Sequence, residues 1–62
     1  MTDRIFRIAD AYAKELIAKG VKRIQLVATH AAHLRKELGR PQTAQEMDMF
    51  IRHVRMKIEN QP

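Results

Sequence analysis

The middle of the chain reads GVKRIQLVATHAAHLRKELG from Gly20 to Gly39, and this stretch decides the expected fold. Apolar residues recur in it every three or four positions, which is the spacing of one buried face of an α-helix. These residues are Ile24, Val27, Ala31, Leu34 and Leu38. The pattern predicts a helix over residues 22–38, with one face in the core and the other free to meet solvent or a partner.

The first part of this stretch also fits a short β-strand. One face of such a strand would carry Ile24, Leu26 and Ala28. A single strand finds no partner within a chain of 62 residues, so two subunits would have to pair it as an antiparallel ribbon. We favour the helix, because its spacing continues to Leu38 whereas the alternation ends at Thr29. An α-β-α chain with residues 21–28 as an intersubunit strand is the alternative.

Two further helices are expected, over residues 4–19 and 44–59. Gly20 fits the position just after a helix, where glycine adopts the left-handed conformation at little cost. Thr43 and Glu46 have the spacing of a capping box, in which each side chain binds the main-chain amide of the other. The buried stripe of the last helix is expected to comprise Met47, Phe50, Ile51, Val54 and Ile58.

The sequence therefore predicts one all-α domain of three helices over residues 1–62, with a frayed tail at 60–62. A chain this short buries only about 60% of its unfolded surface, and without cysteine it has no disulfide to compensate. Self-association is the simplest way to add buried area, so we expect a homodimer. Its interface is expected to use a second apolar stripe of the first helix and the far face of the last, namely Phe6, Ala13, Ile17, Met49, His53 and Met56.

Positive charge is concentrated in the middle of the chain. The net charge is +5, from twelve Lys and Arg residues against seven Asp and Glu residues. Residues 21–40 carry a net charge of +4, whereas residues 1–20 carry +1 and residues 41–62 carry none. Such a concentration attracts nucleic acid or an acidic protein surface through its long-range field.

The polar face of the middle helix is the predicted nucleic-acid-binding site. An exposed helix fits the major groove, which favours DNA, and basic side chains at both ends, Arg35 among them, are placed to hold phosphates. The site comprises Lys22, Arg23, Gln25, Thr29, His30, His33, Lys36 and Arg40. These residues predict a DNA-binding regulator or accessory factor. The alternative is an adaptor or inhibitor that binds an acidic protein partner through a helical surface.

Catalysis and metal binding are not expected. The chain lacks Cys and Ser, the commonest nucleophiles, and its two glycines both stand at helix ends rather than in a phosphate loop. His30, His33 and His53 lack the cysteine partners and spacing of zinc sites, so no metal or other cofactor is predicted. No apolar run approaches the roughly 20 residues of a membrane span. We expect no membrane partner and a cytoplasmic location, with which the lack of cysteine agrees.

Overall fold

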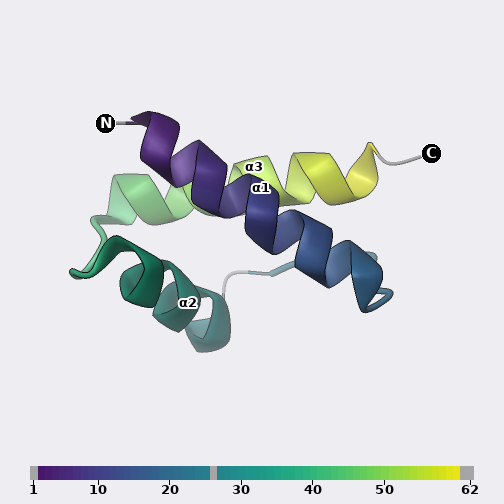
Figure 1. Ribbon diagram of the computed structural model, residues 1–62, viewed down its shortest axis with the longest axis horizontal. Coiled ribbons are helices and arrows are strands. Elements are labelled where there is room, and N and C mark those ends of the chain that lie inside the picture. Colours follow the sequence, from purple (N-terminus) through teal and green to yellow (C-terminus); the bar gives the residue numbers. More distant parts are fainter. Residues whose placement is uncertain (1, 26, 61–62) are drawn as a thin grey trace.

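The computed structural model consists of three α-helices and describes residues 2–25 and 27–60 (Figure 1). The helices are α1 (Thr2–Ala18), α2 (Ala28–Leu38) and α3 (Ala44–Glu59). α1 and α3 run in the same general direction and pack most closely, while α2 runs back across them. No strand occurs within the described residues. The prediction of a small all-α domain is therefore confirmed.

The turn after α1 follows the predicted glycine ending. Gly20 has a φ of +82°. Its amide donates to the carbonyl of Ile17, and the amide of Val21 donates to the carbonyl of Leu16, both at 3.0 Å. These are the two hydrogen bonds of a Schellman motif, which satisfy carbonyls that the end of a helix otherwise leaves unpaired. The turn fixes the direction in which the chain leaves α1.

The middle helix begins later than the sequence predicts. It starts at Ala28 instead of residue 22, and residues 21–25 and 27 are not helical. We call the segment between α1 and α2, residues 21–27, the linker; Leu26 lies outside the described residues. α2 spans only roughly 16 Å at 1.5 Å per residue, half of the 32 Å length of the molecule. A non-helical chain covers up to about 3.3 Å per residue, roughly twice the rise of a helix, so the linker reaches further along the molecule than six more helical residues would.

The linker also changes which apolar residues are buried. Ile24 remains in the core, although it reaches it from the linker rather than from a helix. Val27 was predicted on the same buried stripe, yet it precedes the first residue of α2 and is 45% exposed. The strand alternative for residues 21–28 requires a second chain as its partner, so it stays a prediction.

The core lies between all three helices. Every residue of the stripe predicted for the last helix is buried, which confirms that part of the pattern. α1 contributes Ile5, Ala9, Tyr12, Ala13 and Leu16 to the same core, and α2 contributes Leu34 and Leu38. Ile8, Ile17, Val21, Ala31 and Met49 pack against its edge. The domain thus has one continuous core that the linker completes through Ile24.

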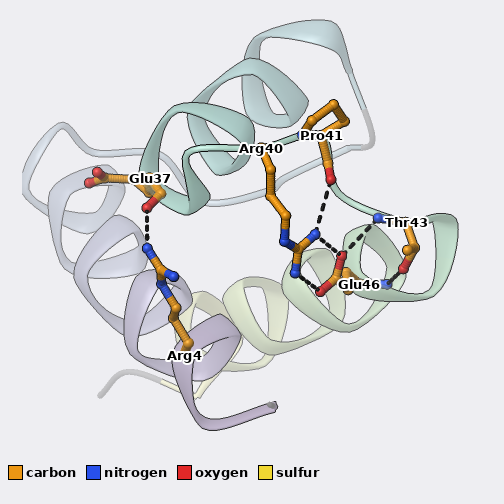
Figure 2. Close-up of polar contacts among 6 residues, drawn as sticks. All are labelled: Arg4, Glu37, Arg40, Pro41, Thr43 and Glu46. Carbon is orange, nitrogen blue, oxygen red and sulfur yellow. Dashed lines mark hydrogen bonds and ion pairs between the residues drawn. The ribbon is translucent and has the colours of Figure 1, made fainter.

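The last helix begins at the predicted capping box (Figure 2). The amide of Glu46 donates to the Thr43 hydroxyl at 3.1 Å, and the amide of Thr43 donates to the Glu46 carboxylate at 2.8 Å. At its other end, the amide of Asn60 donates to the carbonyl of Met56. Asn60 therefore caps the helix, and the rest of the expected tail, residues 61–62, lies outside the described residues.

The Gly20→Ala variant is expected to be less stable than the wild type by about 1–2 kcal/mol, because alanine adopts a positive φ only with strain. Urea unfolding followed by circular dichroism measures this difference. Lys14→Ala, at an exposed helical position, is the control and should change the unfolding free energy by less than about 0.5 kcal/mol. Equal effects of the two substitutions would contradict the assigned turn.

Candidate nucleic-acid interface

Six of the eight predicted nucleic-acid-binding residues are solvent exposed. Lys22, Arg23 and Gln25 lie on the linker, Thr29 and Lys36 lie on α2, and Arg40 lies in the turn after α2. Gln25 was expected on the helix beside Thr29, but the later start of α2 separates the two residues between different elements. Arg35, next to Lys36, is exposed as well. We call six of these exposed residues, those on the linker and on α2, the basic surface: Lys22, Arg23, Gln25, Thr29, Arg35 and Lys36.

The two histidines of α2 turn toward α1, not away from it. A hydrogen bond joins Nδ1 of His30 to the hydroxyl of Tyr12. The ring of His33 stacks on the ring of Tyr12, with centroids 4.1 Å apart. Both imidazoles are partly buried. The prediction that they lie on the open face of the helix is therefore wrong, because the buried Tyr12 hydroxyl requires a polar partner and His30 supplies it.

Burial also reduces the positive charge that His30 can carry. Loss of solvent holds the pKa of the His30 imidazole below its usual value, and the neighbouring His33 acts in the same direction. The neutral form of the ring therefore predominates at neutral pH. Burial likewise raises the pKa of the Tyr12 hydroxyl, and the Glu15 carboxylate adds to this effect. The Tyr12–His30 pair is a neutral contact that joins α1 to α2.

Arg40 is held by an acidic partner (Figure 2). Its guanidinium donates to both carboxylate oxygens of Glu46, at 3.0 and 2.8 Å, and to the carbonyl of Pro41 at 3.0 Å. Such a two-pronged pair is stronger than a single contact, and it orients Arg40 across the turn between α2 and α3. Arg40 therefore stabilises the turn between α2 and α3. A phosphate would have to compete with the Glu46 carboxylate for the Arg40 guanidinium.

The ion pairs among the described residues leave the basic surface without acidic partners. The paired Lys and Arg residues are Lys19, Arg40, Arg52 and Lys57, and none of them lies on the linker or on α2. The only acid of α2, Glu37, receives a hydrogen bond from Arg4 on its main-chain carbonyl, at 3.2 Å (Figure 2). The charge of the basic surface is thus not neutralised by the protein itself.

Two hollows adjoin this surface. One, of about 700 Å³, has an apolar floor that includes Ala28, Ala31, Ala32 and Pro41, with Arg35, Lys36 and Arg40 around it. The other lies between the linker and α3 and brings Arg55 beside Lys22 and Arg23. Arg55 was not among the predicted site residues. No periodic or spacing signal connects it to the linker, because tertiary packing alone brings the two together.

The residues predicted for the dimer interface occupy two places on the α1–α3 pair. Phe6, Met49, His53 and Met56 line a shallow hollow together with Arg52, and Met56 is 46% exposed. Ala13 is 1% exposed in the core of its own chain, and Ile17 packs at the edge of that core. The second stripe of α1 is therefore largely covered by α3 of the same chain.

His53 connects the two helices at this hollow. Its ring stacks on Phe6, and its Nε2 donates to the Asp10 carboxylate at 2.7 Å. The Lys57 ammonium lies 3.6 Å from the same carboxylate. The hydrogen bond from His53 is the main reason that the pKa of Asp10 lies below its usual value, and Lys57 lowers it further. Asp10 and Lys14 are four residues apart, which is the spacing of a helical ion pair, but the partners of Asp10 come from α3 instead.

The three histidines do not form a common site. His30 and His33 pack on Tyr12, whereas His53 lies beside Phe6 and Asp10. In the part of the chain that the structure describes, no three His, Cys, Asp or Glu side chains are grouped to hold a metal ion. No helix within that part is long and apolar enough to cross a membrane.

Comparisons of the chain with protein-family models, curated proteins and solved structures gave no match. Functional inference therefore rests on the surface itself. Its features are a basic surface without acidic partners, two hollows beside it, and an apolar hollow between α1 and α3.

The Arg40–Glu46 pair predicts a pH dependence of stability. The Arg40 guanidinium, followed by the Thr43 amide, holds the pKa of the Glu46 carboxyl at about 2, against an ordinary value of 4.5. A carboxyl whose pKa falls on folding stabilises the fold above its unfolded pKa, and the contribution is lost as pH falls from about 4.5 to about 2. Urea unfolding should therefore show wild type more stable than Glu46→Gln near neutral pH. A difference that stays constant down to about pH 2 would contradict the assignment.

Proposed function

We propose that this protein is a small, non-enzymatic nucleic-acid-binding protein that contacts the phosphate backbone through the basic surface. The observation that carries the proposal is the absence, among the described residues, of acidic partners for Lys22, Arg23, Arg35 and Lys36. Exposed cations of one sign attract a polyanion and release its counterions on binding.

The geometry favours contacts to phosphates over reading of bases. His30 and His33 face Tyr12, so Gln25 and Thr29 are the only neutral polar side chains of the predicted site that stay exposed. Amide and hydroxyl groups of this kind can bond base edges. Phosphate contacts position a protein on nucleic acid without conferring sequence preference. We therefore propose weakly selective binding, with DNA favoured because the exposed face of α2 fits the major groove. An accessory role in the cytoplasm suits such binding better than recognition of one operator.

A second candidate function, protein binding through α1 and α3, is supported by the shallow hollow around Met49 and Met56. Arg52 pairs with Asp48 at 3.0 Å and His53 pairs with Asp10, so the charges beside this hollow are largely compensated. A chain of net charge +5 can approach a second copy of itself there with the least repulsion. We propose that homodimerisation uses this hollow, and an acidic protein is the competing partner for the basic surface.

Binding to a short DNA duplex should weaken steeply with salt. With four phosphates neutralised, the logarithm of the binding constant should fall against the logarithm of salt concentration with a slope of roughly −3.6. Lys36→Gln should make this slope less steep by about 1. Fluorescence anisotropy titrations at several salt concentrations measure both. Absence of binding at low salt, or binding that does not respond to salt, would contradict the proposed function.

Charge reversal provides a test of where the duplex binds. Arg23→Glu combined with Lys36→Glu should abolish measurable binding in the same assay, because acids at these positions repel phosphates. The matched control combines Lys14→Glu with Arg7→Glu, which makes the same change in net charge on exposed positions of α1. This control should retain most of the affinity. Equal losses in the two variants would indicate a response to net charge and not to the basic surface.

The proposed dimer is tested by the mass in solution. Sedimentation equilibrium should give twice the chain mass of 7.2 kDa for the wild type, and the monomer mass for Met56→Glu, since a buried unpaired charge strongly opposes association. Lys14→Gln should remain dimeric. A wild-type protein that sediments as a monomer at all concentrations would rule out the homodimer and leave the hollow to another partner.

A further inference from the structure

The hollow between the linker and α3 has a volume of about 460 Å³ and is half enclosed. Its apolar floor includes Ile24 and Ile58, both buried. Its rim carries Lys22 and Arg23 from the linker, and Arg55 and Glu59 from α3. Two segments that are distant in sequence thus direct three cations and one carboxylate to one concave site.

Arg55 is held in place at this site. Its Nη2 donates to the carbonyl of Ile24 through a long hydrogen bond of 3.5 Å. This contact joins the last helix to the linker, and Arg55 lines the same hollow as Lys22 and Arg23. Because a guanidinium has five N–H donors in a fixed plane, the remaining donors stay available to a bound group.

The convergence of cations is unfavourable without an anion. Among the described residues, no ion pair joins Lys22, Arg23 or Arg55 to Glu59 or to any other acid. Like charges around a concave surface repel each other, and the low-dielectric wall behind them strengthens the field in the hollow. The hollow is lined by three positive charges and one negative charge, so its net charge is +2. An anion with two negative charges would neutralise it.

We propose that this hollow binds the terminal phosphate of a nucleic-acid strand. A phosphate monoester carries a charge of about −1.5 to −2 near neutral pH, whereas an internal phosphodiester carries about −1. The inference rests on the proposed function, and it names the part of the nucleic acid that the linker and α3 recognise together.

The test compares a short DNA duplex that carries phosphates at its strand ends with the same duplex carrying hydroxyls. Fluorescence anisotropy should show roughly tenfold tighter binding of the phosphorylated duplex, the size of one or two charge-assisted hydrogen bonds. Arg55→Gln should reduce this ratio to about one. Glu59→Gln should increase it, because the variant removes the carboxylate that repels the phosphate.

Arg52→Gln is the matched control, since it makes the same charge change on the same helix but lies outside this hollow. It should keep the tenfold ratio, and circular dichroism should show that all variants fold. Equal binding of the two duplexes by the wild type would overturn this inference and leave the proposed function standing. An identical loss of the affinity ratio in Arg52→Gln and Arg55→Gln would also overturn this inference and leave the proposed function standing. No binding of either duplex would overturn the proposed function and this inference together.

Discussion

The fold depends on the burial of Ile24, which reaches the common core from the linker and not from a helix. Full burial of an isoleucine contributes roughly 1.5–3 kcal/mol, which matters in a domain whose whole stability is on the order of 5–15 kcal/mol or less. The Schellman turn at Gly20 directs the chain toward this position, and Val21 packs beside the core. The same constraint displays Arg23 and Gln25 outward, because their neighbour Ile24 points inward and successive side chains of an extended segment alternate. Lys22 is exposed as well. The basic surface of the linker is thus a consequence of completing the core.

The inner contacts of α2 determine what its outer face can recognise. Tyr12 lies in the core with a hydroxyl that requires a partner, and His30 provides one while His33 covers the ring. These contacts partly bury both imidazoles, so the basic surface keeps its ammonium and guanidinium groups and only Gln25 and Thr29 as neutral polar side chains. Contacts of these cations to phosphates carry no sequence information. Selectivity is therefore expected mainly from the shape of the nucleic acid.

The sequence predicts those features that depend on local spacing. The glycine ending at Gly20, the capping box at Thr43 and the buried stripe of α3 each follow from residues within one or two helical turns, and the structure has all three. The start of α2 could not be predicted in this way. Burial of Ile24 is compatible with a helix or with a non-helical chain, and the choice depends on the distance that the linker must bridge between helices whose arrangement is tertiary.

The positions of the site residues can likewise be divided into those that local sequence predicts and those that tertiary packing determines. Exposure of Lys22, Arg23 and Lys36 follows from their charge and was predictable. The inward position of His30 had one signal in the sequence. Tyr12 stands at helical spacing from Ile5, Ile8 and Leu16, and histidines are available on the next helix. The pairing of Arg40 with Glu46 also had a signal in the sequence, because Glu46 already belongs to a capping box near the end of α2. The position of Arg55 had no such signal, since its place beside the linker results only from packing of α3.

The cations of the linker and of α3 are placed so that anion binding there would also affect the stability of the fold. The linker is fixed to the domain by Ile24, by Val21 and by the long hydrogen bond from Arg55. An anion shared by Lys22, Arg23 and Arg55 would add further contacts between the linker and α3, and it would relieve the repulsion among the three cations. A ligand that binds only the folded chain stabilises that chain in proportion to the logarithm of its concentration over its dissociation constant. In so small a domain, the surface proposed to bind a polyanion is therefore also the surface through which binding would stabilise the fold.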